Sequence, residues 1–310
     1  MCPKAAGRAG QRPGSDRDAL KMVSKAAIEA LTRVDGTASG IKFNKLVYHI
    51  HKKLSLAADR RLRFSLPHRW YLYGAVVDLD TLYGYIVSRN PEEEMLGDFT
   101  WNAGRAALDG PEGLWEEASA LAQEFAATYA GPEGIPAMLR AHYADAPLQF
   151  QRDYLEWSLL TEDMIRGRAM DSPPVAALYF HKLEATFPTE MEPRLSPLFA
   201  RLALFLGPLI EDRGASELQV LRWQVDSVRE FWRVFCLFLS SKYNAGLAPA
   251  RLDHYEHRAV EELTAYKRRL SAFLTHEYAE AVPDEKHLNG RVGRSLAEAL
   301  SASISGGDAL

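Results

Sequence analysis

The sequence predicts an all-α fold: a multi-helix bundle with a long antiparallel helical hairpin near the C-terminus. Two observations lead to this prediction. Apolar residues recur at intervals of three and four along most of the chain, which is the spacing of helices with one buried face. Hydrophobic residues make up 47% and charged residues 25% of the 310 residues, so the chain can bury a large core.

Start and stop signals place the helices of the first part of the chain. Ser15 and Asp16 are suited to cap a helix, and Pro111 and Pro173 each stand where a first helical turn tolerates proline. Four helices follow from these signals, at 15–34, 41–58, 111–129 and 175–186. Between residues 70 and 87 we predict a helix after Gly74, with a small β-hairpin as the alternative.

Two long amphipathic helices form the predicted hairpin. The first, 216–243, repeats apolar residues at Leu218, Leu221, Val225, Val228, Trp232, Phe235 and Leu239. The second, 250–280, repeats them at Leu252, Tyr255, Ala259, Leu263, Tyr266, Leu270 and Phe273. Since only the short breaker 244–249 separates them, the two helices are expected to pack antiparallel with their aromatic residues in the core.

Composition shifts divide the chain into parts. We predict flexible tails at 1–15 and 303–310, an N-terminal helical unit at 16–130, a linker at 131–147 and a C-terminal helical bundle at 148–302. The longest apolar stretches, 202–210 and 231–239, are shorter than the roughly 20 residues of a membrane span, so none is expected. Two cysteines supply no disulfide framework and no zinc ligand set, which favours the cytoplasm.

Charge is concentrated in one segment. Between residues 42 and 69 the chain carries eight basic side chains and one acid, a local charge of +7 in a chain of formal net charge −4. The basic residues are Lys42, Lys45, Lys52, Lys53, Arg60, Arg61, Arg63 and Arg69. An aromatic run that ends at Gly74 follows directly, and we call 42–74 the basic/aromatic segment. An exposed imbalance of this size attracts anionic partners.

The basic/aromatic segment supplies the candidate contact residues. They are Lys45, Lys52, Lys53, Arg60, Arg61, Arg63, Arg69, Trp70 and Tyr73. An acidic protein surface is the preferred partner, because cations steer its approach and exposed aromatic side chains anchor it. Nucleic acid is the alternative, with the cations on phosphates and the aromatic rings on bases. The third interpretation is a solvated helix face with the aromatic residues in the core.

Three arginine–histidine pairs have a spacing that resembles the short motif of HEPN ribonucleases, which are also all-helical. The pairs are Arg63 with His68, Arg251 with His257, and Arg269 with His276. The resemblance implies that such a pair acts on an RNA backbone. Chance alone produces a couple of such matches in a chain with nine histidines, and Pro67 interrupts the helix on which the first pair should lie.

Other catalytic and metal-binding patterns are sparse. Asp253, His257 and Glu261 share one face of a helix and are the candidate metal ligands, although such a row is usually a solvated helix surface. The sequence contains no phosphate-binding Gly-rich loop, no His-Glu-x-x-His and no Gly-x-Ser-x-Gly. We therefore predict no cofactor and no catalytic residue other than the arginine–histidine alternatives.

The basic/aromatic segment also resembles the start of the Panacea (SocA-like) antitoxin domain. The resemblance lies in Lys42-Phe43-Asn44-Lys45-Leu46-Val47-Tyr48 and in Trp70-Tyr71-Leu72-Tyr73-Gly74. Members of that family open with a similar lysine-rich helix and continue to an aromatic-Tyr-Gly-Pro-Val turn, where this chain has Gly74-Ala75. The resemblance implies a helical domain that binds toxin partners or serves proteolytic adaptors.

Three functions follow as hypotheses. The preferred one is a cytoplasmic interaction or regulatory protein, antitoxin-like or part of a defence system, that binds an acidic protein through the basic/aromatic segment. The second is a nucleic-acid-binding protein or HEPN-like ribonuclease. The third is a structural subunit that self-associates through the apolar face of 218–239; the sequence leaves the oligomeric state open.

Overall fold

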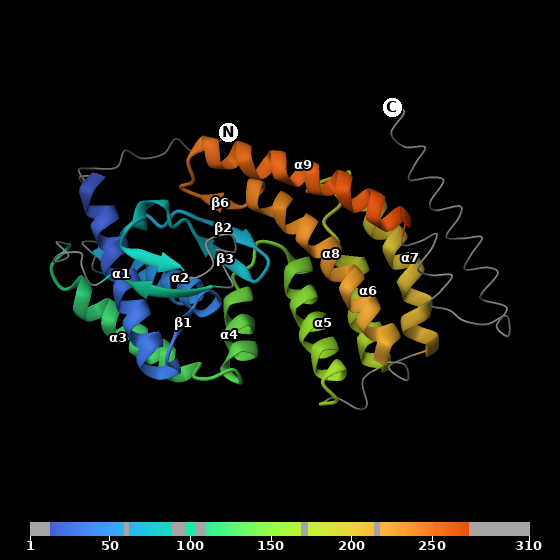
Figure 1. The fold of residues 1–310 in the computed structure, drawn as a ribbon, viewed down its shortest axis with the longest axis horizontal. Coiled ribbons are helices and arrows are strands. Elements are labelled where there is room, and N and C mark those ends of the chain that lie inside the picture. Colours follow the sequence, from blue (N-terminus) through green and yellow to red (C-terminus); the bar gives the residue numbers. More distant parts are fainter. Residues whose placement is uncertain are drawn as a thin grey trace. The chain divides into compact units, whose positions relative to one another are not determined.

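The computed structural model describes residues 13–58, 62–88, 97–102, 110–168, 173–213 and 218–272 (Figure 1). Within them the chain forms two compact units. Unit 1 contains the chain up to His142 together with Asn244–Ala248, and unit 2 contains Tyr143–Tyr243 and the chain from Pro249. Unit 1 is therefore built from two stretches that lie about a hundred residues apart in the sequence.

Unit 1 combines helices with two small sheets. Its helices are α1 (Pro13–Asp35), α2 (Gly40–Leu56), α3 (Leu114–Thr128) and α4 (Gly134–Tyr143), with a short 3-10 turn, η2 (Asp80–Leu82). Helix α1 packs against α2 and α3, and α2 packs against the strand β3. The Ser39 hydroxyl accepts a hydrogen bond from the Lys42 backbone at 3.5 Å, so a serine caps the start of α2.

The two sheets are antiparallel and each has three strands. The first has the order β1-β5-β4, and the second has the order β3-β2-β6. The strands are β1 (Ala38–Ser39), β2 (His68–Tyr71), β3 (Gly74–Val77), β4 (Ile86–Ser88), β5 (Asp98–Trp101) and β6 (Asn244–Ala245). In the second sheet His68 pairs with both Val77 and Ala245, so the distant residues of unit 1 complete the sheet around β2.

The described regular elements of unit 2 are all helices, joined by loops. Its helices are α5 (Gln149–Ile165), α6 (Pro173–Thr186), α7 (Ser196–Arg213), α8 (Leu218–Lys242) and α9 (Pro249–Ala272). Helix α8 packs against α5, α7 and α9, and α6 packs against α5 and α7 (Figure 1). The core is aromatic: Tyr154 stacks on Trp232 with ring centroids 3.9 Å apart, and Phe187 stacks on Phe199 at 4.6 Å.

The prediction of an all-α fold is confirmed in part: the described chain is mainly α, but unit 1 also contains two small antiparallel sheets. The predicted helices at 15–34, 41–58, 111–129 and 175–186 correspond to α1, α2, α3 and α6. The predicted helix after Gly74 is wrong, because Gly74–Val77 is the second strand of a hairpin, as the alternative stated. The segment 131–147, predicted as a linker, contains α4, which supplies a buried side chain to unit 1.

Several predictions fall outside the described residues. These are residues 1–12 of the predicted tail 1–15, the tail 303–310, Arg60, Arg61, His276 and the last part of the predicted C-terminal bundle, 273–302. Helix α1 begins at Pro13, so the last three residues of the predicted tail are helical. None of the described helices is both long and apolar enough to cross a membrane.

Candidate functional site

Helix α2 has polar side chains that are buried in unit 1 and others that are exposed to solvent. Lys42 is buried, and its ammonium donates to Asp35 Oδ2 at 2.7 Å, to the Tyr129 carbonyl at 2.7 Å and to the Gly131 carbonyl at 2.9 Å. Asp35 Oδ1 in turn accepts from the Gly131 backbone at 2.8 Å. All three ammonium hydrogens therefore have acceptors, and Lys42 joins the end of α1 to the connection between α3 and α4.

Asn44 and Lys45, on the same helix, bind the outer edge of strand β3. Asn44 Oδ1 accepts from the Val77 backbone at 2.8 Å, and Lys45 Nζ donates to the Ala75 carbonyl at 2.8 Å. Both side chains are buried, at 0% and 1% exposure. An edge strand exposes unpaired backbone groups, and here side chains of α2 satisfy them.

The buried amine of Lys45 differs from an ordinary lysine. Burial removes its hydration and lowers its pKa from 10.5 to about 7. Lys45 thus has lost much of its positive charge at neutral pH, and it faces the interior of unit 1. The prediction that Lys45 contacts a partner does not fit this position.

His142 binds the same strand from α4. Its Nε2 accepts a hydrogen bond from the Ala75 backbone at 2.9 Å, and its ring lies 4.9 Å from the Tyr48 ring and 5.3 Å from the Trp70 ring. His142 is 7% exposed. Burial and the charges of Lys45, His68, Lys52 and His49 hold the pKa of His142 well below its ordinary value. The imidazole is therefore neutral at neutral pH.

Two more histidines lie beside this group. His68 Nδ1 lies 2.9 Å from the Leu66 carbonyl, and its ring lies 5.2 Å from the Tyr48 ring. Burial lowers the pKa of His68, and burial together with the charge of His68 lowers the pKa of His51. The groups whose charges act on His142, namely Lys45, His49, Lys52 and His68, come with it from α2, β2 and α4. Sequence reasoning missed this arrangement because these elements are distant in the chain.

Among the described residues of the basic/aromatic segment, fewer predicted contact residues are exposed than expected, and Arg60 and Arg61 lie outside those residues. Lys52 and Lys53 are exposed on α2, and Tyr73 is 39% exposed at the turn between β2 and β3. Arg69 and Trp70 are buried, at 6% and 5% exposure, so neither lies on a binding surface. Successive side chains of a strand point to opposite faces, so Arg69 and Trp70 lie on the two faces of β2, and both faces are covered there.

One exposed patch remains on the last turns of α2. Leu56 is 74% exposed, and it follows Lys52 by four residues and Lys53 by three. Residues at these spacings are neighbours on a helix surface. We call Lys52, Lys53 and Leu56 the α2 patch. Two cations beside an exposed apolar side chain fit a partner surface that is both acidic and apolar.

The described contacts of the arginine–histidine candidates run to other groups, and His276 lies outside the described residues. Arg63 Nη2 donates to the Ala57 carbonyl at 3.2 Å, while His68 lies against Leu66 and Tyr48. In α9, His257 Nδ1 lies 2.7 Å from the Asp253 carbonyl. Arg269 binds Glu230 at 2.9 Å and Glu262 at 3.7 Å.

The candidate metal ligands do not form a metal site. Asp253, His257 and Glu261 are exposed on α9. Among the described residues, no group of three or more His, Cys, Asp or Glu side chains is arranged to hold a metal ion.

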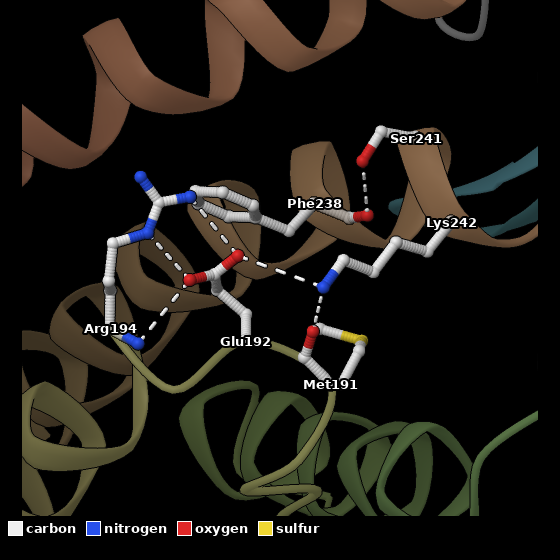
Figure 2. Close-up of polar contacts among 6 residues, drawn as sticks. All are labelled: Met191, Glu192, Arg194, Phe238, Ser241 and Lys242. Atoms are coloured by element: carbon white, nitrogen blue, oxygen red, sulfur yellow. Dashed lines mark hydrogen bonds and ion pairs between the residues drawn. The ribbon is translucent and has the colours of Figure 1, made fainter.

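Unit 2 contains a separate charged group, shown in Figure 2. The carboxylate of Glu192, which is 6% exposed, accepts from Arg194 Nε at 2.6 Å and from Arg194 Nη2 at 3.1 Å. Lys242 Nζ lies 3.8 Å from Glu192 Oε2 and donates to the Met191 carbonyl. The guanidinium lies over the Phe238 ring at 5.1 Å. The Arg194 hydrogen bonds and charge lower the pKa of Glu192 despite its burial.

We call Glu192, Arg194 and Lys242 the Glu192 clamp, because their contacts link two segments of unit 2. It ties the loop between α6 and α7 to the last turn of α8, and its cations and its carboxylate already bind one another. A structural role follows from this mutual satisfaction.

Comparison with known proteins gave no match: no protein-family model, no curated protein and no solved structure is similar to this chain.

Proposed function

We propose that the chain is a cytoplasmic interaction or regulatory protein, antitoxin-like in its mode of action, that binds an acidic protein partner through the exposed part of the basic/aromatic segment. The observation that supports this most is the α2 patch, where Lys52 and Lys53 are exposed beside Leu56 at 74% exposure. An apolar side chain this exposed, flanked by two cations, is suited to a partner that supplies carboxylates and an apolar contact.

The exposed aromatic side chain of Tyr73 is a second contact in this proposal. It is 39% exposed in the turn of the β2–β3 hairpin, while Lys45, Asn44 and His142 hold the hairpin from the other side. A rigid turn presents Tyr73 at little entropic cost on binding. Tyrosine is also among the residues that contribute most to interface affinity.

The remaining part of the proposal concerns unit 2. We propose that α5 to α9 form a helical bundle in which α8 and α9 are an antiparallel hairpin, and that this unit is a scaffold. From Val225 onward the apolar face of α8 is buried: Val225, Val228 and Phe235 are at most 1% exposed. Phe231 and Phe235 contact rings of the same unit, which weighs against self-association through this face.

The test is affinity purification from native-host lysate with the tagged full chain, at low salt and after nuclease treatment. The variant Lys52→Glu/Lys53→Glu should lose the partner with an unchanged melting temperature, because both side chains are exposed. The matched control is Arg258→Glu/Arg268→Glu, which makes the same charge change at exposed positions of α9 and should keep the partner.

Two outcomes would count against the proposal. Equal recovery of the partner by both double variants would remove the α2 patch from the interface. Recovery of nucleic acid, with all protein partners lost on nuclease treatment, would favour the nucleic-acid alternative, and a steep loss of binding with salt would then follow.

A further inference from the structure

The hydrogen bond between Ala75 and His142 has a property that its neighbours lack: it depends on the protonation state of the acceptor. Nε2 can accept from the Ala75 N–H only while it carries no proton. The hydrogen bond that the Val77 N–H on the same strand donates to Asn44 Oδ1 has no such requirement, since an amide oxygen always accepts. Protonation of His142 would place two N–H donors against each other.

The packing around His142 leaves no room for an adjustment. Gly74 has φ +108°, and a Cβ placed on it would lie 2.4 Å from His142 Cδ2 and 2.6 Å from Nε2. The ring is also in contact with Tyr48 and Trp70 on its other sides. Protonation therefore breaks the Ala75 hydrogen bond inside a tightly packed contact, where the ring lies close to Gly74, Tyr48 and Trp70.

The titratable groups whose charges act on His142 come from α2 and β2. Helix α2 contributes Lys45, His49 and Lys52, and strand β2 contributes His68. Strand β3 contributes glycine, alanine and valine only, and Arg140 lies on α4 itself. The nearest acid along β3, Asp78, accepts at Oδ1 from the Asp80 backbone. The neighbouring charges thus oppose a positive charge on the ring.

We propose that His142 is a proton-operated latch that holds α4 to strand β3 while its imidazole is neutral and releases the strand when the imidazole is protonated. The latch is closed at neutral pH and opens as the pH falls below the ordinary histidine range. A consequence that rests on the proposed function is that opening would loosen the turn that carries the contact residue Tyr73, since Tyr73 directly precedes Gly74.

The direction of the effect follows from proton linkage. The ring binds its proton more weakly in the closed state than in the open state, so the population of the open state rises as pH falls. One proton is involved, so the equilibrium constant for opening increases by about tenfold for each pH unit between the ordinary value of 6.5 and the closed-state pKa.

The experiment measures backbone amide hydrogen exchange of the full chain between pH 7.5 and 5, corrected for the intrinsic pH dependence of exchange. We expect the protection of the Ala75 amide to fall by up to about tenfold per pH unit below 6.5. The Leu46 amide, buried in α2, reports unfolding of unit 1 as a whole, which also frees His142, so its protection falls with pH too. Local opening is marked by a protection at Ala75 that is lower than the protection at Leu46 at each pH. Histidine NMR titration should give His142 a pKa below 6.5. No partner is needed, so the result is independent of the proposed function.

A neutral replacement separates the latch from a general effect of acid. His142→Gln keeps an acceptor for the Ala75 amide and cannot be protonated, so the pH dependence at Ala75 should vanish. His257→Gln, an exposed histidine of α9, should keep it. Protection at Ala75 that does not change with pH, or that equals the protection at Leu46 at every pH, would overturn the latch. A wild-type His142 that titrates at 6.5 or above would do the same, even if the variant fails to fold.

Discussion

Gly74 is a residue at which the β2–β3 hairpin closely approaches His142 of α4. Its positive φ of +108° is one that other residues rarely adopt, and His142 occupies the space that a side chain would need. We expect Gly74→Ala to destabilise unit 1 through both effects. Gly36, with φ +78° and no atom within 4 Å of a Cβ, is a matched control that carries only the conformational cost.

The two variants can be compared by urea denaturation. Gly36→Ala should lower the free energy of unfolding by about 1–2 kcal/mol, the cost of a left-handed backbone at an L-residue. Gly74→Ala should lower it by about 1–3 kcal/mol more, because it also overpacks the contact with His142. Equal losses in the two variants would show that a side chain placed against His142 at position 74 adds nothing to the loss of unfolding free energy.

The lysines show how far a residue's role could be predicted from sequence. Lys42, Lys45, Lys52 and Lys53 all lie in the predicted helix 41–58, and the sequence does not distinguish one from another. The structure buries the first two and exposes the others. The difference depends on the acceptors that each ammonium meets, namely Asp35 and backbone carbonyls from β3 and from the end of α3. Those acceptors are distant in sequence, so local pattern cannot reveal them.

The position of the loop between α6 and α7 depends on ion pairs. Glu192 binds Arg194 and Lys242, and the pKa of Glu192 is lowered in the folded chain (Figure 2). Its contribution to stability is therefore complete above the ordinary carboxyl pKa of 4.5 and is lost as pH falls through the folded value. We expect Glu192→Gln to lower the free energy of unfolding by about 1–3 kcal/mol at pH 7.

An exposed pair supplies the control for this prediction. Glu230 binds Arg269, and both side chains are nearly half exposed. Glu230→Gln should cost less than about 1 kcal/mol, as surface ion pairs do. Thermal or urea denaturation at pH 7 and pH 4 measures both variants, and the difference between wild type and Glu192→Gln should shrink at pH 4. A larger loss in Glu230→Gln would contradict the assignment of the clamp to Glu192.

Elements differ in how well their sequence defines them. The helices α8 and α9 have long stripes of apolar residues, and such stripes predict a helix well because the period of 3.6 repeats many times. Strands β2 and β3 have four residues each, are covered on both faces and carry no alternation. A fully buried short strand and a buried helical turn look the same in sequence, so the helix prediction after Gly74 was wrong.

On the scale of the whole molecule, the two units are not separable by a single cut. Unit 1 includes β6, which lies between α8 and α9 in the chain and pairs with β2 through Ala245 and Asn244. Composition suggests a boundary in 131–147, and the chain does pass from one unit to the other there, after His142. The second crossing, around 244–248, has no signal in composition, because two paired residues are too few to form a pattern.

A fragment experiment tests this discontinuous organisation. Fragment 1–142 lacks β6 and leaves an edge of β2 unpaired. Joining 244–248 to residue 142 through a flexible Gly/Ser linker should restore the strand and raise the free energy of unfolding by about 1–2 kcal/mol, the gain from a few hydrogen bonds. The same fusion with proline at both Asn244 and Ala245 cannot donate to β2 and should behave like fragment 1–142. Identical urea midpoints for all three chains would mean that β6 adds nothing to unit 1 and that a cut after His142 leaves it complete.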